Sequence, residues 1–239
     1  MQNKRKLGER QQMPKFNNLK VHRVILQPSV GEHSILHNQF IWRTEKRWVG
    51  NNEIAIADIQ EPIWWNRPYT SNVFCKLEDD GMYSYNLPHY SGEDSFKTQY
   101  NYLLNKHSVP IAIHIKLDDT WTDEDKQLLS KMCQTCVYET LLDLGVSKED
   151  VEAPKNDLIF QGRKFAGVEH AGSGDVYSEN MAITLQALPE QEIFQRLKGQ
   201  YALRRPITGI VEEVPSVTKE AFIERLIERL NLFIEEHFS

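Results

Sequence analysis

The chain has 239 residues and a mass of 27.9 kDa, with 40% hydrophobic and 26% charged residues, as expected for one large globular domain that needs no disulfides. The formal net charge of −6 argues against non-specific binding to nucleic acid, which requires a basic surface. No apolar run reaches the roughly 20 residues of a membrane helix, no signal peptide is visible, and three cysteines suit a reducing compartment, so a cytoplasmic protein is expected.

Residues 1–20 carry six lysines and arginines in a polar setting and are expected to form a flexible basic arm, because chain ends are seldom tied down. Contact of this arm with an acidic partner is the other interpretation. Residues 21–239 are expected to form a single domain. Within it, strands are predicted at 21–27, 39–43 and 53–59, the last with alternating apolar residues.

The segment 61–69 cannot form a regular helix, because Pro62 and Pro68 remove backbone donors. Trp64 and Trp65 would point to opposite faces of a strand, one toward the core and one toward a recognition surface; alternatively, both pack under a loop. Two short apolar stretches, 73–77 and 82–86, flank an Asp-Gly pair and predict a hairpin.

The clearest element is a long helix. Segment 95–105 before it is compatible with helix or strand, and 109–117 alternates like a strand, so that His114 faces either a pocket or solvent. Thr122 followed by three acidic residues predicts a helix start, apolar residues then recur at helical spacing, and Gly145 marks the end. Cys133 and Cys136 lie inside this helix, so their CxxC spacing indicates packing rather than a metal site.

The last third of the chain predicts a strand at 157–160, a turn at 161–163 and a return strand from 164 to 168. A further strand is predicted at 181–186, followed by helices at 190–198 and 218–238. The final helix is amphipathic, with one apolar face formed by Phe222, Leu226, Ile227, Leu230 and Phe233.

The segment from 109 onward resembles the catalytic domain of the biotin/lipoate protein ligase family, lipoate–protein ligase A-like members in particular. It has a strand, a long helix ending in Leu-Gly-Val, Asn-Asp-Leu at 156–158, and Gly-Arg-Lys-Phe-Ala-Gly at 162–167. Segments 177–186 and 204–230 match later family elements in order, and 40–43 matches weakly. The resemblance implies an α/β (α+β) fold with mixed, largely antiparallel sheets packed with helices, of the class II biotin/lipoate ligase type.

Members of this family use ATP to convert a carboxylic acid into an acyl-AMP and then pass the acyl group to a lysine amine of a carrier protein. The resemblance implies a small acid such as lipoate, ATP, Mg²⁺ and an acceptor protein, with neither nucleic acid nor membrane as partner. Lys164 takes the place of the catalytic lysine, whose ammonium neutralises the acid and the α-phosphate. Ligand and nucleotide contacts carry over to Asn156, Asp157, Gly162, Arg163 and Gly167, and the Mg²⁺ contact to Asp157.

The family's glycine-rich loop is altered here. The corresponding segment, 89–96, keeps Ser91 and Gly92 as candidate binding residues but has Glu93 and Asp94 where glycines belong. Two carboxylates facing a triphosphate would repel it by several kcal/mol in a partly desolvated site. Three interpretations stay open: an acyl ligase, an ATP-independent acyl transferase, for which no cysteine lies in an obviously equivalent place, and a catalytically inactive binding module.

Overall fold

The structure, a computed structural model, describes about half of the chain. The described residues are 16, 19–26, 52–59, 63–65, 74–77, 83–86, 102–104, 108–170, 175–186 and 209–238. The predicted strand at 39–43, the predicted helix at 190–198 and the altered loop at 89–96 lie outside these residues.

The described residues form a seven-stranded sheet in the order β1-β2-β7-β11-β10-β9-β8. β1 and β2 are parallel, and all other neighbours in this sheet are antiparallel. The prediction of an α/β (α+β) fold with a mixed, largely antiparallel sheet is therefore confirmed. The strands are β1 (Lys20–Leu26), β2 (Glu53–Ile59), β7 (Ser108–Lys116), β8 (Val151–Glu152), β9 (Asp157–Phe160), β10 (Arg163–His170) and β11 (Val176–Thr184).

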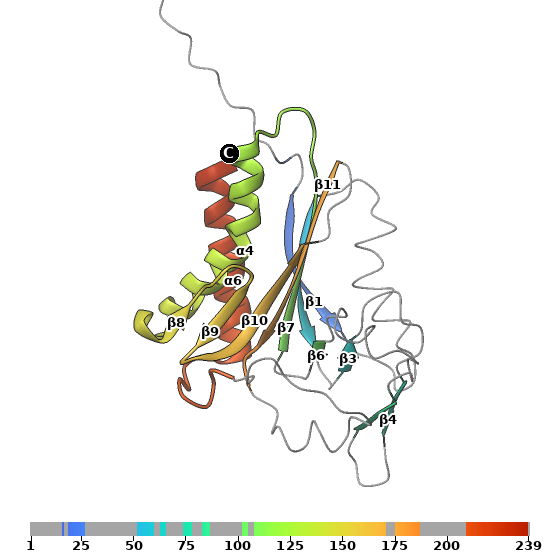
Figure 1. The fold of residues 1–239 in the computed structure, drawn as a ribbon, viewed down its shortest axis with the longest axis vertical. Helices are drawn as coiled ribbons and strands as arrows, with labels where there is room; N and C mark the ends of the chain where they lie inside the picture. Colours follow the sequence, from blue (N-terminus) through green and yellow to red (C-terminus); the bar gives the residue numbers. More distant parts are fainter. Residues whose placement is uncertain are drawn as a thin grey trace, which may run out of the picture.

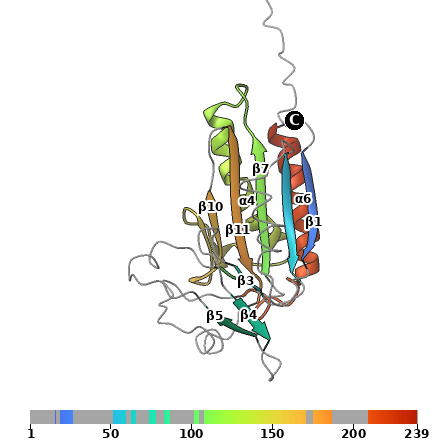
Figure 2. The same cartoon turned by 90° about the vertical axis from the view of Figure 1, so that its right-hand side faces the viewer.

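Two small ladders lie on the side of the sheet away from the helices (Figures 1 and 2). β4 (Phe74–Leu77) pairs antiparallel with β5 (Tyr83–Asn86), which confirms the predicted pairing. β3 (Ile63–Trp65) pairs with β6 (Tyr102–Leu104), so the described residues of the segment 61–69 form a strand and not a helix. The side chains of the two tryptophans in β3 lie outside the described part, and their two interpretations stay open.

The predicted long helix is α4 (Asp123–Asp143), and its start is a reciprocal cap. The Thr122 hydroxyl accepts from the Asp125 N–H at 3.2 Å, while the Asp125 carboxylate accepts from the Thr122 N–H at 2.8 Å. Gly145, with a φ of +94°, ends the helical stretch as predicted, and a short 3₁₀ turn, η2 (Lys148–Asp150), follows. Cys133 and Cys136 are both buried inside α4, as expected.

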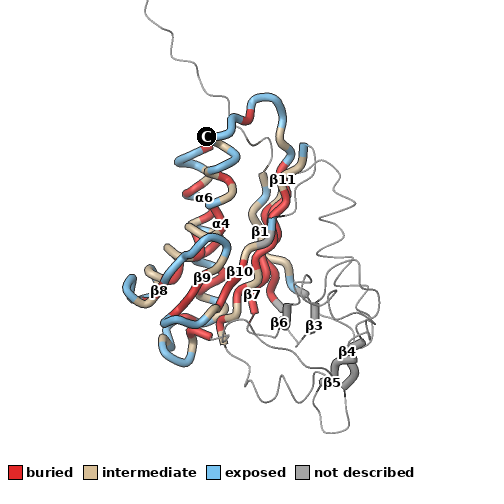
Figure 3. The backbone as a smooth tube through the Cα atoms, in the orientation of Figure 1, coloured by how far each residue is buried: buried red, intermediate tan, exposed pale blue. Residues whose placement is uncertain are grey.

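The final helix, α6 (Lys219–Phe238), packs beside α4 on one face of the sheet (Figure 1). Four of its five predicted core residues are buried and Ile227 is half-buried. Figure 3 shows the buried residues concentrated in the central strands and the helix surfaces that meet them. None of the helices in the described segments combines the length and apolar content that crossing a membrane requires.

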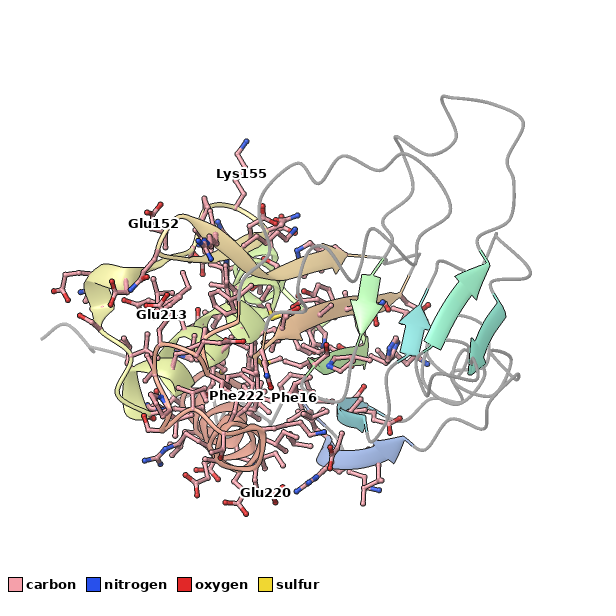
Figure 4. The ribbon with its side chains drawn as sticks, turned by 90° about the horizontal axis from the view of Figure 1, so that it is seen from below. Phe16, Glu152, Lys155, Glu213, Glu220 and Phe222 are labelled. Carbon is pink, nitrogen blue, oxygen red and sulfur yellow. The ribbon has the colours of Figure 1, made fainter. Side chains whose placement is uncertain are left out.

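Charged side chains fix the start of α6 against β1 and β2. Asp58 is almost fully buried and pairs with Lys219 and with Arg23, whose Nε lies 3.0 Å from the carboxylate. Arg23 also reaches Glu220 at 2.7 Å, and Figure 4 shows Glu220 at the outer side of the helix. Burial acts to raise the pKa of Asp58, but the two hydrogen-bonded cations outweigh it and the pKa falls below its usual value.

Part of the predicted N-terminal arm packs on the domain. The ring of Phe16 lies 5.3 Å from that of Trp121 and 5.0 Å from that of Phe238, and Leu19 also packs against the core. Lys20 opens β1. The rest of the segment 1–18 lies outside the described residues.

The sheet has two chemically different faces. The face toward α4 and α6 carries large apolar side chains, among them Ile111 and Ile113 of β7 and Met181 of β11. Because side chains alternate along a strand, the residues between them point the other way, onto what we call the far face. In the central strands the far face carries Ala55, Ala57, Ser108, Ala112, His114, Ser178, Asn180 and Ala182.

Candidate functional site

The site begins at a tight hairpin between β9 and β10. Gln161 and Gly162 both have positive φ, +48° and +77°, as a two-residue type I′ turn requires. Phe160 and Arg163 pair directly on either side of them, which confirms the predicted turn. A Cβ on Gly162 would meet nothing within 4 Å, so this glycine is needed for the backbone conformation of the turn.

A β-bulge then changes which way the side chains of β10 point. Lys164 pairs with Ile159 and Ala166 with Leu158, so Phe165 is an extra residue in β10. Phe165 and Ala166 are both buried in the core beneath the helices. Without the bulge, residues three apart would face opposite sides of the sheet; with it, Lys164 and Gly167 share the far face.

Three predicted site residues meet on this face. The Nζ of Lys164 lies 2.7 Å from Oδ1 of Asp157, and the two side chains are 37% and 28% exposed. Asp157 pairs across the ladder with Gly167. A Cβ on Gly167 would stand 2.7 Å from Nζ and 2.9 Å from Cε of Lys164, so the lysine crosses the place a side chain would occupy.

The backbone around Asp157 is held from two directions. Its N–H donates to the carbonyl of Pro154 at 3.0 Å, and its carbonyl accepts from the side-chain amide of Gln134 on α4 at 3.0 Å. The carbonyl of Asn156 accepts from the N–H of Val168 at 2.7 Å. Through Gln134, the long helix therefore helps to position Asp157, whose carboxylate pairs with the lysine.

The other predicted residues are placed differently. Asn156 lies exposed in the turn before β9, next to Lys155, which projects outward in Figure 4. Gly162 is at the exposed hairpin tip, and Arg163, as the partner of Phe160, is on the face opposite to Lys164. Ser91 and Gly92 lie outside the described residues. The structure thus joins Lys164, Asp157 and Gly167 and separates Gly162 and Arg163 from them.

The paired charges limit what the site can bind. Both side chains are about one third exposed, so an anion from solvent can reach the ammonium and compete with Asp157 for it. The described segments contain no group of three or more His, Cys, Asp or Glu side chains that could hold a metal ion. Asp157 could offer Mg²⁺ a single oxygen, with the remaining ligands from phosphates and water, which is a usual arrangement for this ion.

A second group of polar residues on the far face was not predicted as part of a site from the sequence. His114 is 1% exposed, Ser178 3% and Asn180 5%, and all three belong to the far face. Both ring nitrogens of His114, the Ser178 hydroxyl and the Asn180 carbonyl have no hydrogen-bond partner among the described residues. Burial lowers the pKa of His114 to about 4, so its ring is neutral at pH 7. The alternation of the 109–117 segment places His114 on this face once the helix side is known.

A buried carboxyl lies on the other face of the sheet, under α4. Glu179 is 1% exposed, accepts a hydrogen bond from the Tyr177 hydroxyl, and lies 3.4 Å from Nδ1 of His170. Burial raises the pKa of Glu179 to about 8, against the hydrogen bonds from Tyr177 and Cys133, which lower it. The backbone of the sheet lies between this group and the lysine face, so it is not part of the same site.

Known structures share this fold. The chain superposes on LipL1 of P. falciparum in complex with lipoate with a TM-score of 0.54, at 11% identity over 92% of this chain and 63% of that one. A bi-partite lipoate protein ligase from Thermoplasma acidophilum, described with its E2 lipoyl domain, gives 0.53 at 13% identity, covering 92% and 84%. A T. acidophilum protein with bound lipoic acid gives 0.50 at 12% identity, covering 92% and 86%.

These comparisons define the fold. The chain has the fold of lipoate protein ligases, as its sequence motifs predict, and spans 63% of the length of the P. falciparum protein. No protein-family profile matches the sequence, and no curated protein sequence matches it.

Proposed function

We propose that this chain is a lipoate ligase-like enzyme that activates a small carboxylic acid as an acyl-AMP and transfers the acyl group to an amine of a carrier protein. The observation that carries the proposal is the Lys164–Asp157 pair, fixed over Gly167 on the far face of the sheet. The resemblance of residues 162–167 to the family's lysine turn and the accessibility of this ammonium to solvent both support the proposal. Structures of the same fold contain lipoate or lipoic acid, which supports a small acid as substrate.

The residues of this chain have separable roles in such a reaction. Two anions, a carboxylate and a phosphate, repel each other, and the Lys164 ammonium offsets this repulsion where the negative charge accumulates. Asp157 holds the ammonium until ligand arrives and could contribute one oxygen to Mg²⁺. ATP would supply the adenylyl group and the driving force. The acyl acceptor is proposed by analogy to the T. acidophilum ligase, which is described with its E2 lipoyl domain.

Mass spectrometry can test this function. Incubation of the full chain with lipoate, millimolar ATP and Mg²⁺ is expected to give lipoyl-AMP. Lys164→Ala is expected to lower its formation by a factor of about 100 or more, because charge stabilisation of the transition state is lost. Lys155→Ala is the matched control, since Lys155 is an exposed lysine in the turn before the same hairpin. Equal yields from the two variants, or no lipoyl-AMP from the unmodified chain, would reject the proposal.

A second candidate is a binding module without turnover. Glu93 and Asp94 in place of two glycines disfavour a bound triphosphate, while the lysine pair would still hold an acid. Calorimetry separates the two functions: the enzyme binds both lipoate and ATP, whereas the module binds lipoate alone.

The two cysteines whose side chains the structure describes argue against acyl transfer through a cysteine without ATP. Cys133 and Cys136 are fully buried in α4, and burial raises the pKa of both thiols, that of Cys136 to about 12. A buried, protonated thiol is a poor nucleophile. Neither therefore supports a transferase reaction.

A further inference from the structure

A polar cluster interrupts the apolar contact between α4 and the sheet. Glu179 of β11 is 1% exposed, and its carboxyl accepts hydrogen bonds from the Tyr177 hydroxyl and from the Cys133 thiol of α4. Nδ1 of His170, the last residue of β10, lies 3.4 Å from Oε2 of this carboxyl. The other oxygen, Oε1, is buried without a hydrogen-bond partner among the described residues. The helix therefore closes over a carboxyl that is only partly satisfied.

The groups around Glu179 do not offset a negative charge. No described lysine or arginine pairs with it. Burial raises the pKa of the Tyr177 hydroxyl and of the Cys133 thiol, and it lowers the pKa of His170, so all three side chains are neutral at pH 7. The neighbouring strand β7 places an apolar residue, Ile113, opposite Glu179. A carboxylate formed here would lack both water and a counter-ion, so the packing of α4 over Glu179 requires the protonated carboxyl.

α4 also links this cluster to Asp157. Cys133 faces the sheet, where its sulfur lies 3.8 Å from that of Met181. The next residue, Gln134, donates from its side-chain amide to the carbonyl of Asp157 at 3.0 Å. A displacement of the helix at Cys133 therefore withdraws Gln134 from Asp157 as well. The same part of α4 covers Glu179 and holds the residue that pairs with Lys164.

We propose that Glu179 is a pH-sensitive switch: its proton holds the middle of α4 against the sheet, and loss of this proton loosens both the helix and the backbone of Asp157. In water the carboxyl has its ordinary pKa of about 4.5, whereas burial under the helix raises that pKa to about 8. Opening of the helix therefore releases a proton, so a rise in pH favours it.

The neighbouring groups titrate outside the range in which Glu179 acts. Once the helix has opened, the pKa of His170 returns to about 6.5 and that of Cys133 to about 9. Proton uptake by His170 promotes opening only below about pH 6.5, and proton release by Cys133 only above about pH 9. Between pH 6.5 and 8 the pH dependence of opening therefore belongs to Glu179.

Hydrogen exchange of backbone amides, followed by NMR on the full chain, tests the switch without any ligand. The amides to follow are those of residues 129–137 in α4 and the N–H groups of Asp157 and Val168, which we call the site amides. Division of each rate by the chemical exchange rate at the same pH gives the opening constant. The opening constants in both places are expected to increase by about tenfold or more between pH 6.5 and 8. Low urea concentrations should leave them unchanged, because a local opening exposes little surface.

Four variants identify the group responsible. Glu179→Gln is expected to abolish the increase in both places, because an amide does not ionise. Glu139→Gln is the matched control, since it is the same substitution at a 41% exposed position of α4, and it should retain the increase. Gln134→Leu should abolish the increase at the site amides only. Tyr177→Phe removes a hydrogen bond that lowers the pKa of Glu179, so the increase should continue above pH 8; this variant keeps the switch testable if Glu179→Gln does not fold.

Three results would overturn the proposal. The first is an increase that persists in Glu179→Gln or levels off at the same pH in Tyr177→Phe as in the parent. The second is exchange in α4 that rises with urea as steeply as global unfolding, because Glu179 would then act on overall stability alone. The third is an increase confined to α4 in the parent, which would exclude the link through Gln134. None of these results depends on whether the chain forms lipoyl-AMP.

Discussion

The side chain of Lys164 occupies the space above Gly167, so that a Cβ on the glycine would stand 2.7 Å from the ammonium nitrogen. The two residues can meet because the bulge at Phe165 turns both onto the far face. The glycine thereby determines where the positive charge lies.

Gly167→Ala should therefore change binding more than stability. The added methyl group meets the flexible end of a lysine rather than backbone, so the melting temperature should change by a few degrees at most. The ammonium must move away from Asp157, and the affinity for lipoate should fall by about tenfold or more. Gly162→Ala is the control, because its φ of +77° strains the turn and lowers stability by about 1 kcal/mol without touching the lysine. Unchanged lipoate binding in Gly167→Ala would contradict this role.

Local sequence signals predicted most of the described elements. Thr122 and Gly145 fixed both ends of α4, and the apolar spacing of 218–238 gave α6 and its buried face. For the strand predicted at 181–186, the start was wrong, because β11 begins at Val176. The polar residues Ser178 and Asn180 interrupt the apolar pattern, since they lie on the far face rather than in the core.

Strand pairing and register, which join residues far apart in the chain, could not be predicted from local sequence patterns. Family resemblance gave Lys164 and Asp157, but only the register of β9 and β10 shows that Arg163 faces the other way. The sequence does not predict the bulge, because Phe165 and Ala166 are equally compatible with a regular strand. The parallel pairing of β1 with β2 likewise depends on a connection rather than on either strand.

Asp58→Ala should be the most destabilising charge deletion in the described region. The substitution removes the buried carboxylate that neutralises Lys219 and Arg23. Lys219 then loses this counter-ion, whereas Arg23 keeps its pair with Glu220. Removal of one partner from a buried pair costs about 3 kcal/mol, which chemical denaturation measures directly. Arg225→Ala breaks the exposed pair with Glu228 and a 3.3 Å contact with Asp143, which keeps its pair with Arg229, and should cost about 1 kcal/mol or less. Similar losses from the two variants would show that Asp58 is not a structural anchor.

Glu179→Gln should stabilise the protein in alkaline solution. The pKa of Glu179 is raised to about 8 by burial, so its carboxyl is neutral in the folded state at pH values where the unfolded chain has already lost the proton. Stability from this group is present below about pH 4.5 and is lost as the pH rises from there through 8. The glutamine cannot ionise and can still accept from Tyr177. The difference in unfolding free energy between variant and parent should thus grow by a few kcal/mol between pH 5 and 8. A constant difference would exclude a neutral carboxyl.

His114→Leu should remove a loss of stability that appears in acid. Burial holds the pKa of His114 at about 4, whereas the unfolded chain takes up the proton near pH 6.5. The stability linked to this group is complete above pH 6.5 and decreases as the pH falls toward 4, by up to about 3 kcal/mol. Glu53 and Ser178 are the cross-strand partners that face the ring, and Glu53 would favour the protonated form. Because Glu179 has the opposite dependence in the same range, the comparison is best made with Glu179→Gln present in both proteins. If the stability of Glu179→Gln and that of the double variant change in parallel between pH 6.5 and 4, the protonated His114 ring must be stabilised in the folded state by solvent or by an anionic partner.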